Sequence, residues 1–166
     1  MKVEDPNALR FILQDEIYLL DEDKSLYSGA QKSQPEIQTS QPVFNYLGAN
    51  KKSFLILVSY PDHEFIKDDH QVALEAVLGR IGYNRDDVAI LNLAKHDAKH
   101  AQLLAFFEPK TLVILGESAI PSGMVDLKFN SIEKSEGLAV LYTFSFDEMM
   151  ANVDNKKTFW EQIKNL

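Results

Sequence analysis

Residues 43–166 alternate short apolar runs with longer segments of helical periodicity. Four runs are typical of strands that are covered on both faces: residues 53–59, 88–93, 111–115 and 138–143. Helices are predicted between and after them, at residues 68–82, 97–107 and 155–166. This alternation predicts an α/β fold, a three-layer α/β/α sandwich with a mostly parallel central sheet.

The helix predicted at residues 68–82 has recognisable start and stop signals. Asp68 and Gln71 have the spacing of a capping box, and Gly82 fits the residue after a helix end. Most of the buried face is expected to come from four apolar positions: Val72, Ala76, Leu78 and Ile81.

The pattern changes in the first 42 residues, which predict a docking segment or helix at residues 1–27. Asp5 and Pro6 suit an N-cap and a first helical position, and apolar residues follow at helical spacing. The positions expected to bind a partner are Leu9, Phe11, Ile12, Leu13, Ile17, Tyr18, Leu19 and Leu20. The alternative is that this segment packs back on its own domain. Residues 28–42, rich in Ser, Gln and Pro, predict a flexible linker to the domain at 43–166.

Composition narrows the function classes. A chain of 166 residues with 45% apolar content suits one domain with a short appendage. The absence of cysteine excludes disulfides, thiolate zinc sites and iron–sulfur clusters. A net charge of −8 argues against tight direct nucleic-acid binding. Acidic residues and a proline stand where a signal peptide would be apolar, so we expect a soluble, cytoplasmic protein. His96 and His100 are expected to be a solvated pair, and neither a metal nor a cofactor is expected.

Several strand ends resemble those of the uracil-DNA glycosylase superfamily. Pro61 matches a Gly-Glu-Ala-Pro-Gly-like loop of the family, and Asn92 matches an asparagine that reads a flipped base. Residues 115–119 resemble its Leu-Gly-x-x-Ala turn. Further matches in spacing follow the fourth strand, at Thr143, Met149, Met150, Asn152, Lys156 and Trp160. The resemblance implies a glycosylase-like fold.

The same resemblance implies that the chemistry is missing. The family's His-Pro-Ser is Ser145-Phe146-Asp147 here, and a serine cannot replace an imidazole that stabilises charge on a departing base. We therefore expect no catalytic residue and a degenerate pocket made of Ser59, Tyr60, Pro61, Asp62, Asn92, Ser145 and Asp147. The alternative is a divergent base-excision enzyme that uses Asn92 with Asp62 or Asp147. An unrelated small ligand is a third possibility.

The order of the parts resembles the psi-subunit family of bacterial DNA polymerase III. The resemblance rests on residues 8–20, 54–93 and 150–163. It implies a non-catalytic accessory subunit whose N-terminal segment binds clamp-loader subunits. Its domain would contact a chi-like or single-stranded-DNA-binding protein, with no cofactor.

Overall fold

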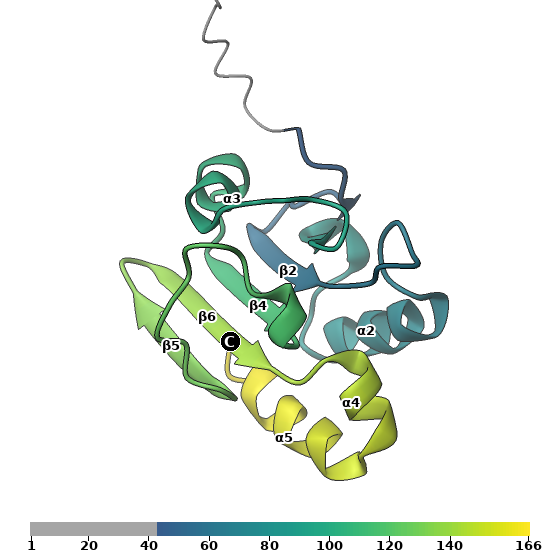
Figure 1. The fold of residues 1–166 in the computed structure, drawn as a ribbon. Coiled ribbons are helices and arrows are strands. Elements are labelled where there is room, and N and C mark those ends of the chain that lie inside the picture. The colour runs from purple at the N-terminus through teal and green to yellow at the C-terminus, as the bar shows by residue number, and fades with distance from the viewer. Residues whose placement is uncertain (1–42) are drawn as a thin grey trace, which may run out of the picture. The chain divides into compact units, whose positions relative to one another are not determined.

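The computed structural model describes residues 43–166, which form an α/β fold around a six-stranded mixed sheet. The predicted docking segment and linker lie outside the described residues. The strands are, in spatial order, β1 (Leu47–Gly48), β3 (Val88–Asn92), β2 (Phe54–Val58), β4 (Thr111–Leu115), β6 (Leu138–Thr143) and β5 (Ser131–Ser135) (Figure 1). The four inner strands are parallel, and the two outer strands pair antiparallel to their neighbours.

Four helices cover the sheet. These are α2 (Asp68–Arg80), α3 (His100–Phe107), α4 (Phe146–Ala151) and α5 (Val153–Ile163). Side chains of α2, α4 and α5 join one buried cluster and those of α3 join another, so helices lie on both faces of the sheet. No helix within residues 43–166 is long and apolar enough to cross a membrane.

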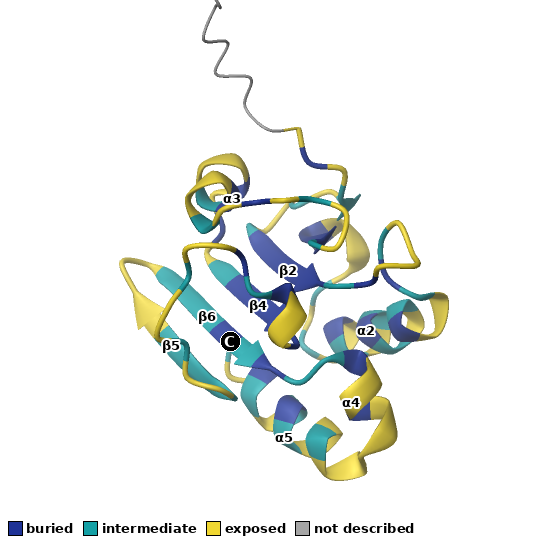
Figure 2. Ribbon diagram, viewed as in Figure 1, coloured by how far each residue is buried: buried dark blue, intermediate teal, exposed yellow. Residues whose placement is uncertain are grey.

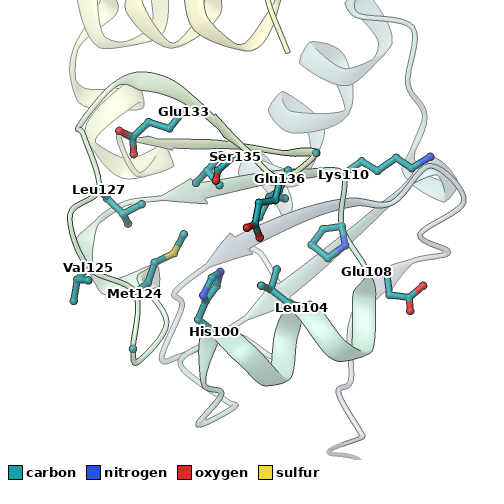
Figure 3. Close-up of a pocket in the computed structure, with 15 residues that line it drawn as sticks. His100, Leu104, Glu108, Lys110, Met124, Val125, Leu127, Glu133, Ser135 and Glu136 are labelled. Atoms are coloured by element: carbon teal, nitrogen blue, oxygen red, sulfur yellow. The ribbon is translucent and has the colours of Figure 1, made fainter.

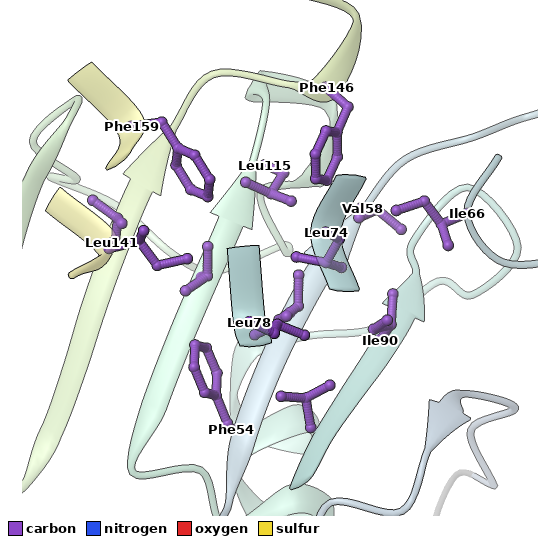
Figure 4. Close-up of a cluster of buried hydrophobic side chains, with 14 of the residues drawn as sticks. Phe54, Val58, Ile66, Leu74, Leu78, Ile90, Leu115, Leu141, Phe146 and Phe159 are labelled. Atoms are coloured by element: carbon purple, nitrogen blue, oxygen red, sulfur yellow. The ribbon is translucent and has the colours of Figure 1, made fainter. Parts of the chain in front are cut away.

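Burial on both faces explains why the inner strands are continuous apolar runs. Along β2, Phe54, Ile56 and Val58 belong to the cluster under α2 (Figure 4), whereas Leu55 and Leu57 belong to the cluster under α3. The ribbon of β2 is buried along its length (Figure 2). All five β2 residues are at most 2% exposed.

The prediction of a mostly parallel sheet is confirmed by the strand directions, and β4 and β6 have the predicted bounds.

α2 begins at Asp68 as predicted and buries Leu78, with Ile81 partly buried against the same cluster, but the predicted capping box and the predicted burial of Val72 and Ala76 are wrong. The N-cap is Lys67, and Gln71 donates to Glu75 instead of completing a capping box with Asp68. The buried residues are His70, Leu74 and Leu78, which recur every four positions on one side of the helix. Val72 is 69% exposed and Ala76 is also exposed, because both lie on the opposite side.

The predicted end of α2 is correct to within two residues. Gly82 follows the last turn with a φ of 81°, a left-handed conformation that suits glycine. The N–H groups of Gly82 and Tyr83 donate to the carbonyls of Gly79 and Leu78. This pair of bonds is a Schellman motif, which satisfies two carbonyls of the last turn.

Candidate functional site

The chain order places a candidate site where β2 and β4 end. From β2 the chain crosses to β3 on one side, then returns to add β4 on the other side. In open α/β sheets, ligand sites form outside the carboxyl ends of strands at such a switch point. The residues that the sequence selected for the degenerate pocket lie after β2, at the end of β3 and after β6.

Asn92 ends β3 and is completely buried. Its Oδ1 accepts from the backbone N–H of Tyr60 at 2.9 Å and of Ala94 at 3.1 Å. Its Nδ2 lies 2.9, 2.7 and 3.3 Å from the carbonyl oxygens of Tyr60, His63 and Glu64. The amide is therefore saturated by backbone groups, and it fixes the loop that follows β2.

Tyr60 and His70 form a buried polar contact beside this loop. The Tyr60 Oη lies 2.8 Å from the His70 Nδ1, and the two residues are 9% and 3% exposed. The His70 ring stacks on Phe146 with centroids 5.4 Å apart, and its Nε2 lies 3.9 Å from the Asp147 Oδ1. The contact thus links the β2 loop, α2 and α4.

The sequence prediction did not include His70 among the pocket residues. Histidine counts as a polar residue in a helical pattern, so its burial was not expected. The available signal was its spacing, since His70, Leu74 and Leu78 form an i, i+4, i+8 stripe. A histidine on such a stripe is expected inside the protein, where its ring nitrogens need partners.

Ser145 is engaged at the start of α4. Its backbone N–H and its Oγ both donate to the Glu148 Oε2 at 2.8 Å, while the Glu148 N–H donates to the Ser145 Oγ at 3.3 Å. This is a capping box, and the sequence carried its Ser-x-x-Glu signature although no helix was predicted there. A Cβ on Gly116 would lie 2.9 Å from the Ser145 Cβ, so the end of β4 contacts the start of α4.

The other pocket residues that the sequence selected are exposed or half-buried. Pro61 and Asp62 are exposed, and Ser59 is half-buried. The Asp147 side chain is 75% exposed although one oxygen faces His70. The structure therefore brings Tyr60, Asn92 and Asp147 to one edge of the sheet and leaves Asp62 on its rim. Within residues 43–166, no group of three or more His, Asp or Glu residues could hold a metal ion.

The prediction that His96 and His100 are a solvated pair is wrong, because both side chains contact other parts of the protein. The His96 Nε2 is 3.1 Å from the Asn45 carbonyl oxygen, and its ring lies edge-on to Phe44. The His100 Nε2 is buried and has no hydrogen-bond partner among the described residues. Both rings are half-buried because α3 and the segment before it pack on the sheet.

Stability is expected to fall at alkaline pH through Tyr60. Burial, with the nearby Asp147 carboxylate, raises the pKa of the Tyr60 phenol above its ordinary value of 10.0. The raised pKa means that the stabilising contribution is complete below pH 10 and is lost as the pH rises toward the folded-state pKa. At pH 11 the wild type should have lost about 1 kcal/mol of unfolding free energy that Tyr60→Phe does not lose. Denaturant titrations of both proteins between pH 8 and 11 would measure this, and parallel curves would contradict it.

Comparison with known proteins gives no family for the chain. No protein-family model matches it, and no curated protein matches it.

Proposed function

We propose that the protein is a non-catalytic accessory subunit of psi type, with a glycosylase-like three-layer α/β/α fold, that acts as a bridge in a bacterial replicative clamp loader. In this proposal residues 1–27 bind clamp-loader subunits in the cytoplasm. The domain at residues 43–166 provides the second contact, to a chi-like or single-stranded-DNA-binding protein.

The main support for a non-catalytic protein is that the side-chain amide of Asn92 is saturated by hydrogen bonds. Base reading in the glycosylase superfamily would need this amide free to pair with a base edge. Here it makes five hydrogen bonds of 2.7–3.3 Å to the backbone. Ser145, at the position of the family's histidine, is engaged in capping α4. These contacts support a retained scaffold whose pocket groups now hold loops together.

The order of the parts supports the bridging role. A 27-residue segment with an expected apolar stripe precedes a 15-residue stretch of linker composition. A flexible linker of that length has a root-mean-square span of roughly 20 Å. Such a tether holds a bound partner near the domain at millimolar effective concentration. A bridge between two proteins needs this combination of docking segment, tether and folded domain.

Binding of the N-terminal segment is expected to depend on its apolar stripe. Calorimetry of a Met1–Tyr27 peptide against the host's assembled clamp-loader core should give a Kd near micromolar or tighter, about −8 kcal/mol. The Leu9→Asp, Ile12→Asp peptide should not bind, because the substitutions place charges on the apolar face.

The matched control is a peptide with Asn7→Asp and Gln14→Asp. It carries the same added charge on the opposite side of the expected helix. It should bind within about threefold of the wild-type peptide. Equal loss in both variant peptides would indicate a charge effect, and no binding by the wild-type peptide would contradict the proposal.

One observation favours the alternative, a divergent base-excision enzyme. His70 brings an imidazole to within 3.9 Å of the Asp147 carboxylate at the carboxyl edge of the sheet. Its 3% exposure weighs against contact with a flipped base. Release of uracil from a single-stranded oligonucleotide by the full chain, abolished in Asp147→Asn, would establish the enzyme and remove the bridging proposal. Asp147 is a suitable test position because its exposed side chain can be changed without opening the core.

A further inference from the structure

Within residues 43–166, part of the sheet face that α3 covers is hollowed and has no second helix over it. On the face that α3 covers, a groove of about 690 Å³ lies between α3, residues 123–127 and the β5–β6 hairpin (Figure 3). Its apolar lining includes Leu104, Met124, Leu127, Leu138 and Val140. These five side chains are all half-buried, so each keeps apolar surface that a partner could cover.

The groove has an acidic border. The residues that line it include three glutamates, Glu108, Glu133 and Glu136, and one lysine, Lys110. Glu133 is paired with Lys128 at 3.5 Å, but Glu108 and Glu136 are exposed. A segment that fills the groove with apolar side chains would therefore gain from positive charges on its flanks.

The groove also contains the side chain of His100, whose ring has a nitrogen without a hydrogen-bond partner among the described residues. Figure 3 shows its ring rising from the first turn of α3 among the lining side chains. Its Nε2 is buried without a hydrogen-bond partner in the described part of the chain. A buried ring nitrogen without a partner is costly, and an incoming polar group would remove that cost.

We infer that this groove binds an amphipathic helix of another protein, with an apolar face and flanking Lys or Arg residues. The inference rests on the proposed function, because it places that function's second partner on the domain. A helix suits the site because a sheet face in an α/β fold is ordinarily covered by one. The apolar face would lie on Leu138 and Val140, and the basic flanks would lie near Glu108 and Glu136.

Charge disfavours the occupants that this chain itself could supply. Residues 1–27 contain seven acidic and three basic residues, a net charge of −4. A second copy of the chain carries −8. Either would bring negative charge to an acidic border, which opposes association.

The test is an NMR titration of the ¹⁵N-labelled full chain with two synthetic 18-residue helices. Both probes carry Leu at positions i, i+3, i+4 and i+7; one has Lys and the other Glu at the flanking positions. The Lys probe should perturb amides mainly in α3, residues 123–127 and the β5–β6 hairpin. The Met1–Tyr27 peptide serves as a third probe.

A pair of variants separates the groove from general charge attraction. Glu136→Lys should weaken the Lys probe about fivefold and strengthen the Glu probe. Glu161→Lys makes the same charge change on an exposed position of α5, and it should alter binding less than twofold. The amide spectrum of each variant verifies that it remains folded.

Three results would overturn the inference: perturbations centred outside the groove, equal weakening by Glu136→Lys and Glu161→Lys, or groove binding by the Met1–Tyr27 peptide as tight as that of the Lys probe. If only the groove titration fails while Met1–Tyr27 binds the clamp-loader core, the proposed function stands without this site. If the core does not bind but the Lys probe does, the bridging function fails and the groove remains a helix-binding site.

Discussion

Replacing Asn92 with alanine is expected to lower the free energy of unfolding by about 4 kcal/mol. The substitution would leave the Tyr60 N–H and the His63 carbonyl without their side-chain partner and would weaken the bonding of the Tyr60 carbonyl, at a place where the Asn92 side chain is fully buried. Each buried group without a partner costs about 1–3 kcal/mol. Urea denaturation would measure the loss, and hydrogen exchange should become faster in the loop at residues 60–64.

The matched control for this prediction is Asn45→Ala. Asn45 is exposed, and its side chain donates one hydrogen bond, to the Glu64 Oε1 at 2.6 Å. Its removal should cost about 0.5 kcal/mol, because water can replace that bond. A loss for Asn92→Ala as small as that for Asn45→Ala would contradict the role of the Asn92 amide in holding the β2 loop.

The Gly116→Ala substitution is expected to lower the free energy of unfolding by about 4 kcal/mol. Gly116 has φ 92° and ψ 158°, a backbone region that residues with a Cβ avoid. The added Cβ would also lie 2.9 Å from the Ser145 Cβ, closer than such atoms normally approach. Strain and overlap therefore add, and thermal or urea unfolding would report their sum.

Gly82→Ala separates the two causes. Gly82 also has a positive φ, 81°, but a Cβ there would meet nothing within 4 Å. That variant should lose only about 1 kcal/mol, from backbone strain alone. Equal losses at the two glycines would mean that β4 and α4 do not approach each other as described.

The inner sheet was predictable because its strands are buried on both faces. Residues 54–58, 88–92 and 111–115 lie almost entirely inside, so each is almost entirely apolar. The outer strands were missed for the converse reason. β1 has two residues, and β5 reads Ser-Ile-Glu-Lys-Ser, with one large apolar side chain. Edge strands of this kind carry too little periodicity to be recognised.

The sequence could predict which strand ends meet at the candidate site, but not which side chains contact each other there. Parallel topology explains why residues after β2, β3 and β6 meet at one edge. The partners of Asn92 and His70 could not be read from the sequence, because they depend on tertiary packing. Asn92 bonds to a loop about 30 residues earlier, and His70 stacks on Phe146, 76 positions later. No local pattern encodes such contacts.

The measurement that tests the bridging proposal most directly is sedimentation velocity of the full chain with the assembled clamp-loader core. At concentrations of about 10 µM, the proposal predicts one fast boundary for the wild type and for Asn7→Asp, Gln14→Asp. The Leu9→Asp, Ile12→Asp chain should instead sediment separately at the rate of the free protein. Separate sedimentation of the wild type, or a fast boundary that persists in the Leu9→Asp, Ile12→Asp chain, would contradict the account.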